Sequence, residues 1–246
     1  MGSRPLIALI GSIGVIAISA CSTPASKELP HSPVATAIST STPVTRPTTS
    51  SSVSRTGVYG DPAAAAKYWQ QQSLEDNCGL VSVADVVGQI TGHAPTEQQI
   101  IALAVNTPSG TNPGPIYAPV NDPSHANGTG GIEMADEVVL LEHYGIKSVM
   151  TNATTHPEQT GLPALERYLT DDRKIIAWVN SAVIWNTSDQ RTAADHFLVV
   201  TGIDTNAEVV HLNDPGADRA DEQVSIATFT TAWQPGGDSI VVTLPA

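Results

Sequence analysis

Residues 72–91 read QSLEDNCGLVSVADVVGQIT, a stretch that places a cysteine where an amphipathic helix begins. From Gly79 to Ile90 the apolar residues recur every three or four positions, the spacing of a helix with one buried face. Asp76 or Asn77 can cap its start, and a glycine follows its end. Cys78 is therefore predicted to lie at a helix N-terminus, where unpaired backbone N–H groups and the helix dipole favour a thiolate.

The order of the remaining patterns predicts the fold class. Helical spacing comes first and period-two alternation follows, which is typical of an α+β domain with a mostly antiparallel sheet. Thr96 and Gln99 are in the register of a capping box at the start of one of the helices. The expected helices are 61–72, 79–90, 96–104, 132–144 and 163–170, and the expected strands are 174–180, 196–202, 208–213 and 239–243.

The N-terminus has the pattern of an export signal. Residues 1–20 contain one early arginine and an apolar run that ends at Ala20, shorter than the roughly 20 apolar residues that span a bilayer. Small residues precede Cys21, as at the cleavage and lipidation site of bacterial lipoproteins. We therefore expect a signal peptide over 1–20 and an extracytoplasmic protein anchored to the bacterial cell membrane by lipidated Cys21. The alternative is an uncleaved membrane anchor.

Composition separates a tether from a folded domain. Residues 21–56 are rich in Ser, Thr and Pro and poor in large apolar residues, so we expect a disordered tether there. Residues 57–246 are long enough for one domain. The chain has 11 Lys and Arg against 24 Asp and Glu, a net charge of −13, and such a surface repels nucleic acid. Cationic or neutral peptides are compatible partners, although the acids can also serve solubility alone.

The two cysteines have different contexts. If Cys21 carries lipid, Cys78 has no disulfide partner and becomes a candidate nucleophile. His196 opens an apolar strand and can face a cleft as the general base. Asp195 would point to the opposite face of that strand. Asp214 ends the next strand, which a hairpin brings beside His196, so it is the better partner for the imidazole.

An acyl-transfer site also needs donors to a developing oxyanion. The backbone N–H of Cys78 can supply one, and Gln72, Gln70 or Gln71 on the lead-in to the helix can supply another. Gly79 is expected to leave room for a substrate backbone. The remaining histidines have no ligand spacing and there is no phosphate-binding glycine loop, so neither metal nor cofactor is predicted.

Together these motifs resemble a known family. Gln72-x5-Cys78-Gly79, a strand-initial His196, and Asn-Asp-Pro at 213–215 are similar to the bacteriocin-processing (double-glycine) peptidases. They resemble still more closely the C39-like, papain-fold cysteine peptidases of bacterial envelopes, and the similarity runs over most of 69–243. The resemblance implies a papain-like fold, a peptide or protein substrate, a Cys78–His196–Asp214 triad, and Gln72 in the oxyanion hole.

Two departures from the family limit this inference. Many relatives have Cys-Gly-Pro-Thr-Ser, whereas residues 78–82 read Cys-Gly-Leu-Val-Ser. The leader-processing members are fused to an ATP-driven transporter that is not expected here, so leader cleavage does not carry over. The function that the sequence favours is a thiol-dependent peptidase of the cell envelope.

Several alternatives stay open at this point. The domain can be a hydrolase of peptidoglycan stem peptides, or a non-catalytic peptide-binding module with Cys78 as a buried structural residue. The Gly-, Pro- and Asn-rich stretch from Asn106 to Gly131 is either a loop that gates the substrate cleft or a disordered insert.

Overall fold

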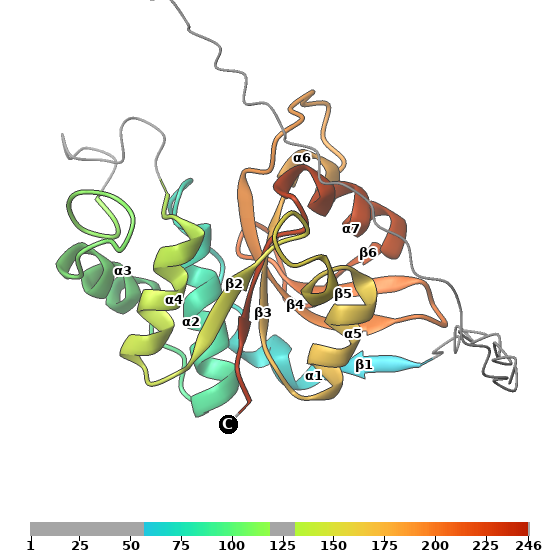
Figure 1. Ribbon diagram of the computed structural model, residues 1–246, viewed down its shortest axis with the longest axis horizontal. Coiled ribbons are helices and arrows are strands. Elements are labelled where there is room, and N and C mark those ends of the chain that lie inside the picture. The colour runs from blue at the N-terminus through green and yellow to red at the C-terminus, as the bar shows by residue number, and fades with distance from the viewer. Residues whose placement is uncertain (1–56, 119–130, 246) are drawn as a thin grey trace, which may run out of the picture. The chain divides into compact units, whose positions relative to one another are not determined.

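The computed structural model describes residues 57–118 and 131–245 (Figure 1). The predicted signal peptide, Cys21 and the tether over 21–56 lie outside the described residues, as does much of the predicted loop between Asn106 and Gly131. In the described part of the chain, no helix combines the length and the apolar character needed to cross a membrane.

A seven-stranded sheet forms the centre of the domain, and every strand pair in it is antiparallel. The strand order is β2-β7-β3-β4-β5-β6, and β1 pairs with β4. The strands are β1 (Val58–Gly60), β2 (Ser148–Thr151), β3 (Ile175–Val179), β4 (His196–Asp204), β5 (Val209–Asn213), β6 (Glu222–Ser225) and β7 (Ile240–Thr243). The helices are α1 (Pro62–Ala65), α2 (Cys78–Thr91), α3 (Glu97–Asn106), α4 (Met134–His143), α5 (Leu162–Thr170), α6 (Ser181–Ile184) and α7 (Ile226–Trp233).

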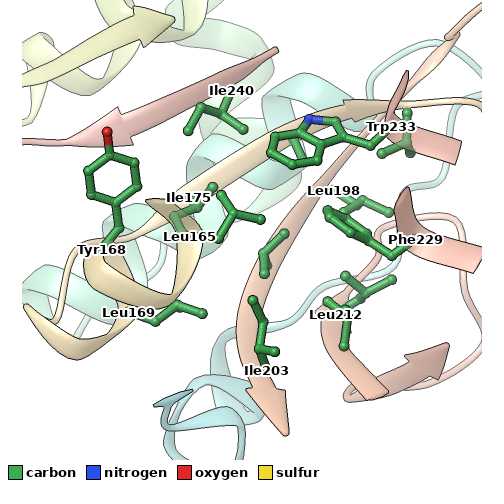
Figure 2. Close-up of a cluster of buried hydrophobic side chains, with 14 of the residues drawn as sticks. Leu165, Tyr168, Leu169, Ile175, Leu198, Ile203, Leu212, Phe229, Trp233 and Ile240 are labelled. Carbon is green, nitrogen blue, oxygen red and sulfur yellow. The ribbon is translucent and has the colours of Figure 1, made fainter. Parts of the chain in front are cut away.

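Both faces of the sheet are covered by helices, so its central strands are apolar on both sides. On β3, Ile175 and Ala177 belong to the cluster that α5 and α7 cover, whereas Ile176 belongs to the cluster that α2, α3 and α4 cover. Figure 2 shows the first cluster, in which Phe229 and Trp233 of α7 pack against the sheet. This arrangement places α2, with Cys78 at its first position, directly against β3 and β4.

The predicted fold class is confirmed: helices and an antiparallel sheet form one α+β domain. The capping box is also present, because Thr96 Oγ1 accepts from Gln99 N and Gln99 Oε1 accepts from Thr96 N. Strands β1, β2 and β6 were not predicted. They are only three or four residues long, and β1 and β2 expose apolar residues such as Val58 and Met150, so no clear alternation marks them.

The predicted lead-in helix over 61–72 is wrong in its second half. Helix α1 is followed by one 3-10 turn, Ala66–Tyr68, and the chain then leaves helical geometry. Trp69 Nε1 donates to the Asp214 carbonyl at 2.6 Å, and Gln72 N donates to the Pro215 carbonyl at 2.9 Å. The lead-in segment thus bonds to the chain that follows β5 instead of to itself.

Candidate active site

Cys78 is the first residue of α2, as the sequence predicts, and its side chain is buried. Asn77 occupies the N-cap position, but its side chain makes no cap hydrogen bond to the helix. The backbone ladder of α2 begins with Val81 N donating to Asn77 O at 3.1 Å. The N–H groups of the first turn therefore receive no hydrogen bond from the Asn77 side chain and can serve as donors to an anionic group.

His196 and Asp214 meet at the ends of two neighbouring strands. His196 opens β4 opposite Val179 of β3, and Asp214 directly follows β5, which pairs with β4. His196 Nε2 lies 2.6 Å from Asp214 Oδ1, and both side chains are buried. Asp195 faces the other way, where it accepts hydrogen bonds from the N–H and Oγ of Ser181. The structure thus brings together the residue pair that the hairpin argument selects.

The electrostatics of this pair favour a charged imidazole. Burial alone would lower the pKa of His196, but its hydrogen bonds to Asp214 and to Cys78, and the charges of both, raise that pKa to about 10. Burial likewise opposes ionisation of Asp214, yet the hydrogen bond from His196 and its charge hold the Asp214 pKa below its usual range. Because Nε2 faces Asp214, Nδ1 is the nitrogen left for Cys78. The three side chains form a connected Cys–His–Asp chain.

Trp185 completes the surroundings of Asp214, a role that the sequence did not reveal. Its Nε1 donates to Asp214 Oδ2 at 2.8 Å, while its ring lies 5.0 Å from the imidazole of His196, centroid to centroid. Gly216 N donates to Asp214 Oδ1 at 2.7 Å. A side chain at Gly216 would collide with the Trp185 ring, since a Cβ there would lie 2.4 Å from it. The glycine after Asn-Asp-Pro therefore makes room for the tryptophan that covers the His–Asp pair.

Glu222 of β6 is a second carboxyl group beside Asp214. Its burial, the charge of Asp214 and a hydrogen bond with Asp214 raise the pKa of Glu222 to about 7. Two adjacent carboxyl groups ionise together only at a cost, so below about pH 7 the proton favours Glu222 and the charge favours Asp214. This arrangement keeps the negative charge next to His196.

Asn213, the first residue of the Asn-Asp-Pro motif, joins the two halves of the candidate triad. Its Nδ2 donates to Asp85 Oδ2 of α2 at 2.7 Å and to the Ala65 carbonyl at 3.0 Å. Burial raises the pKa of Asp85 to about 7. The strand that carries Asp214 is thereby tied to the helix that carries Cys78.

Gln72 lies next to the candidate triad because its backbone N–H is bonded to Pro215. Its Nε2 donates to the Leu74 carbonyl at 2.7 Å, which leaves one amide hydrogen for another acceptor. Gln70 instead directs its amide to the Pro95 carbonyl at 2.9 Å, and Gln71 is exposed. Among the three glutamines that the spacing allows, Gln72 is the one held beside the Asp214–Pro215 turn with a donor to spare.

A cleft of about 610 Å³ opens on Cys78. Its lining combines apolar side chains with carboxylates and, among the described residues, contains no Lys or Arg. The apolar lining residues are Ile132, Met134, Met150, Trp178 and Phe197, and the acidic ones are Glu75, Asp76, Glu133 and Asp195. Such a lining favours a neutral or cationic ligand over an anionic one.

Gly79 does not serve substrate approach as predicted. It is buried against α4 and its lead-in, where a Cβ would lie 2.8 Å from Ile132 Cγ1 and 3.1 Å from Glu137 Oε1. The glycine thus permits close packing of α2. Glu137 is fully buried, and both its oxygens lack a hydrogen-bond partner among the described residues. Burial, with the charge of Cys78 nearby, raises the pKa of Glu137 well above its usual range, which favours the neutral form of this group.

The chain is similar to known proteins in sequence and in fold. The profile of the Peptidase_C39 like family matches residues 65–241. The chain belongs to this family. Uncharacterized proteins of Mycobacterium tuberculosis and Mycobacterium bovis are each 44% identical to it over 196 residues, 76% of this chain and 84% of theirs. A crystal structure of a C39-like peptidase from Bacillus anthracis superposes with a TM-score of 0.51 at 18% identity, over 77% of this chain and 98% of that one. The C39-like domain therefore has the papain-like fold that the resemblance implied.

Proposed function

We propose that this C39-like protein is a cell-envelope lipoprotein that hydrolyses peptide amide bonds with Cys78 as nucleophile. The observation that carries the proposal is the connected chain from Asp214 through His196 to Cys78, at the start of a helix without a capping side chain. A purely packing role for Cys78 would not explain why the His196 imidazole and the N-terminus of α2 both lie beside its thiol.

The mechanism follows from these positions. In the resting pair the thiol proton is already on His196 Nδ1, and Asp214 stabilises this imidazolium. The Cys78 thiolate then attacks the substrate carbonyl carbon. The carbonyl oxygen becomes an oxyanion, which accepts hydrogen bonds from the Cys78 N–H and from the free amide hydrogen of Gln72. His196 then protonates the leaving amine, a thioester remains on Cys78, and water releases the acid with His196 as the base.

Substitution of Cys78 by Ala tests this function. Release of new amino groups from a mixed set of peptides should stop, whereas the free energy of unfolding should change by no more than about 1 kcal/mol, because Ala fills nearly the same space. Turnover that survives in the folded variant would exclude Cys78 as the nucleophile.

Two related functions predict other results. A peptidoglycan stem-peptide hydrolase would release amino groups from purified cell wall and leave free linear peptides intact. A peptide-binding module would bind peptides in the cleft without turnover, and Cys78 would react with iodoacetamide only as fast as an unstructured cysteine. The connected His196–Asp214 pair favours hydrolysis over binding alone.

The envelope location is part of the same proposal and is supported by the apolar run and small residues before Cys21. Cells fed an alkyne-bearing fatty acid should label the full chain but not its Cys21→Ser variant. Equal labelling of both would exclude lipidation at this position.

A further inference from the structure

The carboxylate of Glu97 holds the turn formed by residues 73–77. This turn connects Gln72 to Cys78, the two predicted oxyanion donors. Glu97 is the first residue of α3 and is buried. Its Oε1 accepts from Ser73 N at 2.6 Å and from Asn77 Nδ2 at 2.7 Å, and its Oε2 accepts from Ser73 Oγ at 2.7 Å. Ser73 directly follows Gln72, and Asn77 directly precedes Cys78. Glu97 is therefore hydrogen-bonded to both ends of the turn.

Residues 73–77 form neither helix nor strand, and Ser73, Leu74 and Glu75 are exposed. Elsewhere in residues 73–77, Tyr117 Oη donates to Asp76 Oδ1 at 2.9 Å, so Asp76 is held independently of Glu97. The Asn77 side chain, which would ordinarily cap α2, donates to Glu97 instead. The same contact thus fixes the turn and leaves the first N–H groups of α2 available.

We propose that Glu97 is a positioning residue of the oxyanion hole, whose carboxylate sets the separation between the Gln72 side chain and the Cys78 amide. This inference rests on the proposed peptidase function. Oxyanion donors act only when they lie about 2.7–3.1 Å from the developing charge. Without Glu97, the Gln72 backbone stays bonded to Pro215, but its side chain donates to the Leu74 carbonyl and can shift with the turn. Cys78 and His196 stay in place, because α2 and β4 hold those two residues independently.

The chain offers variants that separate positioning from charge. Glu97→Ala removes all three hydrogen bonds. Glu97→Gln can keep them, because its Oε1 still accepts from Ser73 N and Asn77 Nδ2 and its amide can donate to Ser73 Oγ. Ser73→Ala removes one bond from an exposed side chain and leaves Glu97 paired. Helix α3 keeps its own capping box at Thr96 in every variant.

Two reactions of the same thiol distinguish the oxyanion hole from the nucleophile. Iodoacetamide alkylates Cys78 by displacement of iodide at carbon and develops no oxyanion. Acetyl-Leu-Leu-argininal, an aldehyde whose apolar and cationic side chains suit the cleft, forms a hemithioacetal. In that adduct a bond joins Sγ to the carbonyl carbon, the thiol proton ends on the former carbonyl oxygen, and this oxygen occupies the oxyanion position. Its affinity is read as protection of the Cys78 peptide from alkylation, by mass spectrometry on the full chain in detergent.

Glu97→Ala should lower the affinity for the aldehyde about 10- to 100-fold, a smaller effect than the outright removal of an oxyanion donor. Its alkylation rate should stay within about twofold of the wild-type rate. In Glu97→Gln, the aldehyde affinity and the alkylation rate should both stay within about threefold of the wild-type values. The aldehyde affinity of Ser73→Ala should lie between those of Glu97→Gln and Glu97→Ala. Thermal unfolding of each variant checks the fold. If Glu97→Ala does not fold, Ser73→Ala decides, and unchanged aldehyde affinity in it would overturn the inference.

Other outcomes also count against the inference. Equal losses in both reactions would assign Glu97 a purely structural role, and a Glu97→Gln variant as impaired as Glu97→Ala would assign its effect to charge. If Cys78 of the wild-type protein is alkylated no faster than a free cysteine and the protein binds no aldehyde, the proposed peptidase function itself is refuted. Fast alkylation with aldehyde binding that is indifferent to Glu97 would refute the positioning role alone.

Discussion

Replacement of Asp214 by Asn would test whether the charge of this side chain activates Cys78, or only its shape. The carboxylate accepts from His196 Nε2, Trp185 Nε1 and Gly216 N. An Asn side chain has one acceptor oxygen, so its amide hydrogens would face at least one of these donors. Some papain-like proteases use an Asn in the triad, and the substitution is therefore a fair test of charge.

The expected size of the effect follows from the burial of His196. Burial lowers its pKa, and Asp214 together with Cys78 brings the pKa from 6.5 to about 10. Without the carboxylate only Cys78 opposes the effect of burial, so we expect the His196 pKa to fall well below 10. Each unit of this difference changes the ratio of imidazolium–thiolate to neutral pair about tenfold. Alkylation of Cys78 at pH 6.5 should therefore slow at least about tenfold and up to about a thousandfold.

The same substitution should change the pH dependence of stability. A raised pKa in the folded state means that His196 contributes stability fully below pH 6.5 and loses it as pH rises through about 10. Because the pKa of Asp214 is lowered in the folded state, Asp214 contributes stability above its unfolded pKa of 3.8. This stability is lost as pH falls through the folded pKa. Asp214→Asn should thus be least stable, relative to wild type, between about pH 4 and 6.5.

The assay is the rate of iodoacetamide alkylation of Cys78 from pH 4 to 10, with thermal unfolding over the same range. Asp195→Asn is the matched control, because it removes a carboxylate that lines the same cleft but bonds Ser181 and Arg191 instead of His196. The control should keep the wild-type profile. An Asp214→Asn profile that coincides with the wild type would refute the electrostatic argument.

Two further predictions concern the surroundings of the candidate triad. Trp185→Phe removes one hydrogen bond to Asp214 and should slow alkylation on the acidic side of the profile by about three- to tenfold, because that bond helps to lower the Asp214 pKa. Gly216→Ala should reproduce this change by pushing the Trp185 ring aside, and an unaltered profile in both variants would show that the ring has no part in activation. Gly79→Ala should lower the free energy of unfolding by about 1–2 kcal/mol through the clash with Ile132, despite the better helix propensity of Ala, and unfolding in denaturant would detect it. A stabilised Gly79→Ala variant would contradict the packing that the structure shows.

The features that could be predicted from the sequence are those held by interactions between residues close together in the chain. Helix α2, the capping box at Thr96 and the four apolar strands rest on residues close together in the chain, and these were predicted. The lead-in helix failed because the donors of Trp69 and Gln72 bond to carbonyls more than 140 residues away. Local propensity cannot anticipate such a partner.

By itself, the sequence determined the α+β class, a cysteine at a helix start, a strand-initial histidine and an Asn-Asp-Pro turn, because spacing and turn chemistry encode these features. Only the tertiary structure decided which groups surround them. Trp185 packs against His196, Glu222 lies beside Asp214 with a raised pKa, and Glu97 holds the turn before Cys78. The physical reason is that burial and hydrogen bonding between distant segments set the charge and position of a side chain, and neither leaves a periodic signal along the chain.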